Sequence, residues 1–128
     1  MSGFSNYLEE EILKAALNGQ SFPLIPTVYL GLHLSSPTDA DTGLEVDRPS
    51  YTRIQVDFDS PTGGSTSNMY EVNFPIATES WGTITHFGIY SAITSGNLLF
   101  WGTFSSPVLI DAGDTLRIPQ SSIALSID

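Results

Sequence analysis

The segment from residue 81 to residue 104 reads WGTITHFGIYSAITSGNLLFWGTF, and its pattern predicts a β-hairpin that is apolar on both faces. Because side chains alternate along a strand, His86 is expected to share a face with Ile84 and Tyr90, whereas Phe87 and Ile89 take the other face. The turn sequence TSGN follows, and the aromatic side chains of LLFWGTF also fall on both faces. This composition is typical of strands that are covered on both sides.

Each of the two apolar faces of the hairpin therefore needs a layer of protein packed against it. One layer is an opposing β-sheet, and the other is the N-terminal helix, a long loop or a second copy of the protein. A single short helix shields only part of a sheet, so self-association is the economical explanation. The expected self-association interface contains Phe87, Ile89 and Trp101, with His86 near its rim.

Further short runs with a period of two lie on either side of the hairpin. They include VYLGLHL, TRIQVDFDS and MYEVNF, and in the last of these Tyr70, Val72 and Phe74 are expected to point inward. Clusters rich in Pro, Gly, Asp and Ser separate the runs and predict turns. About eight short strands at this spacing predict a mainly β fold, an antiparallel β-sandwich or barrel, with one N-terminal α-helix.

The helix is predicted from residue 7 to residue 17. Asn6 is its expected N-cap, with Glu9 completing a capping box, and Gly19 is expected to end it in the left-handed conformation. Four residues form its apolar stripe and are the candidate docking residues: Leu8, Ile12, Leu13 and Leu17.

The chain is expected to form a single domain, in which residues 1–26 are a helical arm and residues 27–128 a β-sandwich. The linker GQSFPLIP joins the two parts. The apolar stripe would dock on a neighbouring protein or a sister subunit, or it would pack on its own sandwich. The sequence favours neither alternative.

Composition excludes several function classes. Fourteen Asp and Glu residues against four Lys and Arg residues give a net charge of −10, which opposes binding to nucleic-acid phosphates and to anionic lipid. No apolar run is long enough to span a membrane, and the first residues lack the pattern of a signal peptide. The absence of cysteine suits synthesis in a reducing cytosol. We therefore expect neither nucleic-acid nor membrane partners.

The sequence contains only weak matches to the motifs of metal-binding and catalytic sites. DADTGLE places Asp39, Asp41 and Glu45 like a clipped calcium loop, but its glycine is one position early and strands flank it, so an exposed acidic turn is the favoured interpretation. The two histidines, His33 and His86, lack the companions that a zinc site needs. No nucleophile elbow, phosphate-binding loop or dinucleotide fingerprint occurs. We expect no catalytic residue, metal or cofactor, and hence no enzyme.

The chain resembles a family of small bacteriophage virion proteins in four segments that keep their order along nearly the whole chain: SNYLEEEILKAAL, TVYLGLHLSSPTDADTG, WGTITHFGIYSAITSGNLLFWG and IDAGDTLRIP. Members are labelled phage tail or tail-fibre proteins. The resemblance implies a structural protein of the virion surface, made in the host cytoplasm, with no catalytic residues to carry over. It implies other virion proteins as partners, such as the major capsid protein or tail proteins.

Position on the particle is a separate question. A compact domain with a projecting helix, without heptads or a β-solenoid repeat, favours a capsid decoration or cement protein. The alternative is a tail-fibre or tail-tip component, including a glycan-binding module for host attachment that uses exposed Trp or Tyr. The resemblance to phage proteins favours a homotrimer, although a dimer would also close the same interface.

Overall fold

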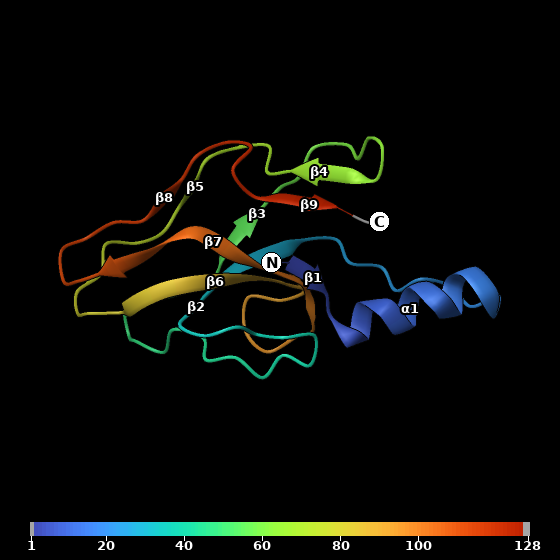
Figure 1. Cartoon of the computed structure of the whole chain (residues 1–128), viewed down its shortest axis with the longest axis horizontal. Helices are drawn as coiled ribbons and strands as arrows, with labels where there is room; N and C mark the ends of the chain where they lie inside the picture. Colours follow the sequence, from blue (N-terminus) through green and yellow to red (C-terminus); the bar gives the residue numbers. More distant parts are fainter. Residues whose placement is uncertain (1, 127–128) are drawn as a thin grey trace.

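The computed structural model describes residues 2–126, which contain one helix and nine strands (Figure 1). The helix α1 spans Asn6–Leu17. The strands are β1 (Ser2–Phe4), β2 (Val28–His33), β3 (Ile54–Val56), β4 (Ser65–Ser67), β5 (Val72–Asn73), β6 (Gly82–Tyr90), β7 (Leu98–Ile110), β8 (Arg117–Ile118) and β9 (Ala124–Ser126). Across these residues, no helix is long and apolar enough to cross a bilayer.

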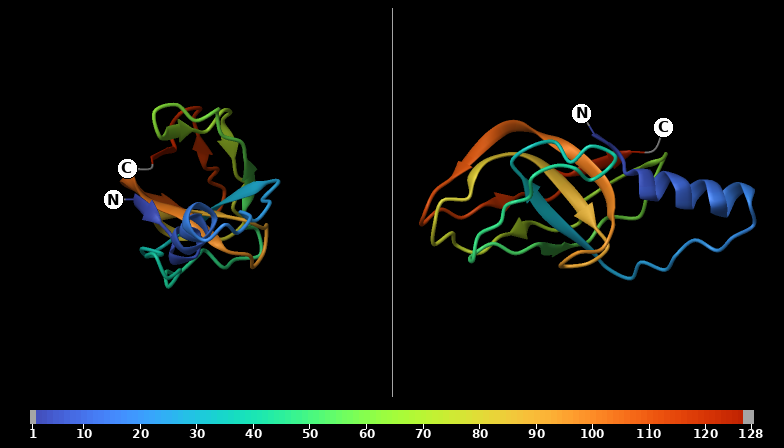
Figure 2. Two further views of the ribbon diagram at one scale, coloured as in Figure 1. Left: turned by 90° about the vertical axis from the view of Figure 1, so that its right-hand side faces the viewer. Right: turned by 90° about the horizontal axis from the view of Figure 1, so that it is seen from below.

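Five strands form the main sheet in the order β1-β7-β6-β2-β3, and every neighbouring pair is antiparallel. Two short ribbons, β4-β9 and β5-β8, face this sheet without closing it into a barrel (Figure 2). The predicted fold class, mainly antiparallel β with one N-terminal helix, is confirmed. The described chain has nine strands in three sheets, in place of about eight.

The main core lies between the five-stranded sheet and the two ribbons. Leu30, Leu32 and Val56 enter it from β2 and β3, in the predicted alternation. Val72 enters it from the ribbon side. Tyr70 does not, and its predicted inward direction is wrong: the chain bends before β5, so the side chain is exposed.

The β6–β7 hairpin forms the middle of the main sheet, and an irregularity in β6 decides which of its side chains face the core. The pairing register shifts between Ile84 and His86, as at a β-bulge. Ile84 therefore lies on the same side as Phe87 and Ile89, and all three are buried in the main core. The prediction that placed Ile84 and His86 on one face is wrong, because the pairing is irregular here: between the pairs formed by these two residues, one residue of β6, Thr85, lies opposite residues 104–107 of β7, and the alternation is not kept.

The helix α1 begins one residue earlier than predicted. Its N-cap is Ser5 rather than Asn6, because the Ser5 Oγ accepts the backbone N–H of Leu8 at 3.1 Å. The third helical residue is therefore Leu8 and not Glu9, so the predicted capping box does not form. Gly19 has a φ of 68° directly after the cap residue, which confirms the predicted end of the helix.

Strand β1 had no counterpart in the sequence analysis. Its Gly3 lies opposite Trp101 of β7, and the backbone N–H of Ser5 then donates to the carbonyl of Leu99 at 2.9 Å. Because β1 and β2 both belong to the main sheet, α1 and residues 18–27 are an excursion between two of its strands (Figures 1 and 2). We call this excursion, residues 6–27, the arm. The expected arm of residues 1–26 thus includes a strand of the sheet.

Candidate functional site

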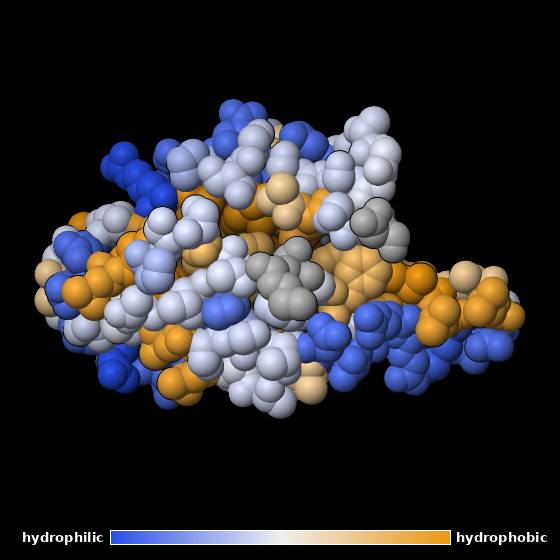
Figure 3. All heavy atoms as spheres, viewed as in Figure 1, coloured by the Kyte–Doolittle hydropathy of each residue, from blue (hydrophilic) through white to orange (hydrophobic). Residues whose placement is uncertain are grey.

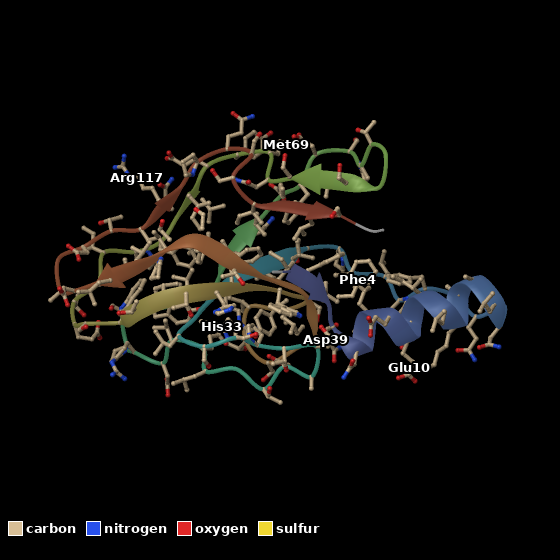
Figure 4. The ribbon with its side chains drawn as sticks, in the orientation of Figure 1. Phe4, Glu10, His33, Asp39, Met69 and Arg117 are labelled. Atoms are coloured by element: carbon tan, nitrogen blue, oxygen red, sulfur yellow. The ribbon has the colours of Figure 1, made fainter. Side chains whose placement is uncertain are left out.

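The second face of the β6–β7 hairpin is covered by the chain's own loop. Residues 34–53, here called the covering loop, run across this face and carry the acidic segment of the sequence. Trp101 Nε1 donates to Asp39 Oδ1 at 2.8 Å, and the Tyr90 hydroxyl donates to Asp41 Oδ1 at 3.0 Å. Figure 4 shows Asp39 beside the start of α1 and His33 beneath the hairpin. A second copy of the protein is therefore not needed to cover this face.

Arg53 holds the covering loop to the turn between β6 and β7. Its Nε and Nη2 bind both carboxylate oxygens of Glu45 at 2.9 Å, and its Nη1 donates to the carbonyls of Ala92 and Ser95 at 2.9 and 2.8 Å. The guanidinium carbon also lies 3.6 Å from the centroid of the Tyr90 ring. One buried cation thus joins three segments of the chain.

Glu45 stays ionised in this setting. Burial raises its pKa, but the hydrogen bonds from Arg53 and Tyr51 and the charge of the guanidinium outweigh burial, so its pKa lies below the usual value. The Tyr51 hydroxyl donates to Glu45 Oε2 at 2.6 Å and accepts the backbone N–H of Leu32 at 3.0 Å. Burial, followed by the neighbouring carboxylates, raises the pKa of both Tyr51 and Tyr90, which remain neutral.

His33 lies at the bottom of this network and is 1% exposed. Its Nε2 is 2.8 Å from the Tyr90 hydroxyl. Since that hydroxyl donates its proton to Asp41, Nε2 carries the imidazole proton and donates to the Tyr90 oxygen. Within the described residues, Nδ1 has no partner, and burial lowers the pKa of His33 below its usual value. The ring is therefore neutral.

These groups include residue types that occur in catalytic sites, but each already has a partner within the chain. His33 and Tyr90 are buried, and the carboxylates of the network, although partly or fully exposed, bind side chains of the same chain. Asp39, Asp41 and Glu45 also point to separate partners rather than to one ion. Between residues 2 and 126, no group of three or more His, Cys, Asp or Glu side chains is arranged to hold a metal ion. The network fixes the shape of the protein.

The residues of the predicted self-association interface do not share an exposed surface. Phe87 and Ile89 are buried in the main core, whereas Trp101 is buried on the opposite face of the sheet beneath Asp39. His86 is partly exposed, and its Nδ1 lies 2.7 Å from the hydroxyl of Thr85. Their predicted common outward direction is wrong, because Trp101 pairs with Gly88 and so lies on the opposite face from Phe87 and Ile89, and because the covering loop occupies that second face. Trp101 also cannot form a stacking platform for glycans, because the covering loop lies over its face of the sheet.

The predicted docking residues of the helix differ in their exposure. Leu8 is buried at the base of α1 and Ile12 is half-buried, but Leu13 and Leu17 are 56% and 75% exposed. Apolar side chains gather along one side of α1, and charged ones along another (Figure 3). The arm extends away from the sandwich (Figure 2), so the outer part of its stripe has no cover within the described residues.

Two apolar hollows open between the main sheet and the ribbons. One, of about 270 Å³, is lined by Val28, Phe58, Leu99, Phe100 and Leu125. The other, of about 410 Å³, lies between β7 and β8 and is here called the β7–β8 groove; Phe104, Val108 and Leu116 line it together with Arg117. Neither hollow was predicted from the sequence, because each combines short segments whose relative placement depends on the tertiary fold.

Comparison with known proteins identifies the family. A family model described as "Podophage GP4 fiber I protein gp80" matches residues 3–126. No curated protein gives a significant match. The family match confirms the resemblance to phage virion proteins, and it supports the tail-fibre alternative over the capsid decoration that the sequence analysis preferred. The chain therefore belongs to the Podophage GP4 fiber I protein gp80 family, a family of phage tail fibre proteins.

Proposed function

We propose that this protein is a non-enzymatic structural component of a phage tail fibre and that its arm docks on a neighbouring virion chain. The observation that carries the proposal is the exposure of Leu13 and Leu17 on a helix that leaves the sandwich. Phe22 and Leu24, in the returning part of the arm, are exposed as well. Exposed apolar clusters of this kind mark surfaces for protein contacts.

Energetics support docking of the arm. Complete burial of one leucine side chain contributes about 1.5–3 kcal/mol relative to its exposed state. Leu13 and Leu17 together therefore offer several kcal/mol that the isolated chain leaves unused. A helix of this length is also marginal without packing partners, so docking would stabilise α1 itself.

The non-enzymatic part of the proposal rests on the polar network described above. His33 and Tyr90 are buried, and each carboxylate of the network already binds a side chain of the same chain. Such a network is suited to keep the covering loop in place under mechanical and thermal load. Membership of a fibre family agrees with this use.

Incorporation into phage particles tests the docking role. A phage that lacks the gene would be supplied with the double variant Leu13→Gln, Leu17→Gln, which polarises the exposed stripe. The matched control is Leu44→Gln, Leu109→Gln, since these leucines are 60% and 57% exposed on the body. We expect both purified proteins to fold, and only the arm variant to be depleted from particles. Equal incorporation of the two variants would overturn the docking role.

A further inference from the structure

We propose that the arm of one copy binds the β7–β8 groove of a second copy of this chain, with the glutamates at the start of α1 close to Arg117. This assignment rests on the docking role proposed above and names the partner and its surface. It is a head-to-tail contact, in which two different surfaces of the same chain meet.

The groove has the composition that an amphipathic helix requires. Its apolar lining comes from the edge of the main core and includes Phe104, Val108 and Leu116, all of them only partly buried. Its polar lining includes Ser105 and Ser106 of β7 and Ser122. An apolar floor beside polar side chains suits a helix that carries leucines on one side and charges on another.

The groove exists because the sandwich is open along β7. Strand β1 pairs with residues 100–102 of β7, and in the described chain no strand pairs with the outer edge of the rest of β7. An open strand edge above an exposed part of the core is a liability that proteins manage by covering it with a helix or a loop. The arm of the same copy does not line the groove, since it contacts β1 and the adjoining part of the sandwich and then runs away from it.

Charge favours the β7–β8 groove over the smaller hollow as the binding site of the arm. Arg117 lines the β7–β8 groove, is exposed, and has no ion-pair partner among residues 2–126, whereas no charged residue lines the smaller hollow. The arm carries three glutamates and one lysine, a net charge of −2. Lys14 is paired with Glu10 and Glu11, which leaves Glu9 without an ion pair in the described chain. Figure 4 shows Arg117 projecting from the outer side of β8.

The periodicity of α1 places these groups together. Glu9 and Leu13 are four residues apart, and so are Leu13 and Leu17, so the three form one row along the helix. When Leu13 and Leu17 enter the apolar part of the groove, Glu9 continues the row toward the Arg117 side. A single arm thus offers both the apolar and the charged partner of the groove.

Disulfide trapping tests the contact directly, because the chain has no cysteine of its own. Full-length Ala16→Cys protein, which keeps Leu13 and Leu17 and carries the thiol at an exposed neighbouring position, would be mixed with Ser105→Cys protein, and in a parallel reaction with Ser60→Cys protein. Both serines are exposed, but only Ser105 lines the groove. We expect the disulfide-linked heterodimer to form at least about tenfold faster with Ser105→Cys, because docking raises the local concentration of the two thiols. Equal rates would overturn the assignment.

Sedimentation velocity supplies the second measurement. We expect reversible self-association that Leu17→Gln weakens about thirtyfold, the effect of losing an interface hot spot. Arg117→Glu should weaken it about fivefold, and adding Glu9→Arg should restore it, whereas Arg48→Glu, with the same change in net charge, should have little effect. A protein that stays monomeric at high micromolar concentration would overturn the contact between copies. If particle incorporation nevertheless depends on Leu13 and Leu17, the docking role stands and its partner is another virion protein.

Discussion

Arg53→Met removes the one cation that joins the covering loop to the β6–β7 turn. Methionine keeps an unbranched side chain of similar bulk, but it loses two hydrogen bonds to Glu45, two to the carbonyls of Ala92 and Ser95, and the contact with the Tyr90 ring. The Arg53 side chain is 9% exposed, so water does not replace these bonds at low cost.

The expected loss follows from the partners left behind. Removing one member of a buried ion pair costs about 3–5 kcal/mol, because the remaining charge is left unpaired in a poorly solvated site. A chain of this length has a total stability of about 6–19 kcal/mol. We therefore expect the free energy of unfolding to fall by at least about 15%, and Tm to fall by about 12–20 °C.

Urea unfolding followed by circular dichroism measures this loss. The matched control is Arg48→Met, since Arg48 is exposed and donates only to the carbonyls of Ser80 and Asp47; we expect a cost below about 1 kcal/mol. The double variant Arg53→Met, Glu45→Leu should cost less than the sum of its two single changes, because it leaves no unpaired charge. Equal costs for Arg53→Met and Arg48→Met would refute the stabilising role of Arg53 between the covering loop and the β6–β7 turn.

Three further predictions concern the cap, the covering loop and pH. Ser5→Ala should lower the free energy of unfolding by about 1 kcal/mol in urea titrations, whereas Asn6→Ala should change it by only a few tenths. Gly43→Ala would place a Cβ 2.6 Å from the Cα of Pro37, so we expect a loss of about 1–3 kcal/mol and faster solvent exchange of the Trp101 indole N–H by NMR. Burial lowers the pKa of His33 below its usual 6.5, so the unfolded chain takes up the proton first and stability should decrease as pH falls through that value. A His33→Gln variant should show a smaller decrease between about pH 7 and pH 5, and an unchanged slope would contradict this origin.

Local signals in the sequence were sufficient for the elements with strong periodicity. The apolar alternation of Leu30 and Leu32 predicted β2 and its core-facing side, and Gly19 predicted the end of α1. The helix start was missed by one residue, because Ser5 and Asn6 are both good N-caps in sequence. Only the bond from Leu8 to the Ser5 hydroxyl distinguishes them.

The parts that were not predicted depend on contacts between distant segments. SGF has no periodicity that indicates a strand, and β1 forms because β7 offers it an edge. The shift at Thr85 also leaves no trace in the alternation, yet it moves Ile84 to the side of Phe87. The pairing of Gly88 with Trp101, which separates Trp101 from Phe87 and Ile89, likewise depends on the strand register and not on a local signal. The acidic segment is the exposed turn that the sequence predicted, but the bonds of Asp39 and Asp41 to aromatic side chains span about fifty or more residues of sequence and have no local signal.

The central claim is that the arm is a docking element of a fibre, and a reconstruction of the intact phage at side-chain resolution tests it most directly. We expect the chain in the tail fibre, with α1 packed against a neighbouring chain and Leu13 and Leu17 buried in that contact. A map in which the fibre contains this chain but α1 is surrounded by solvent would contradict the claim.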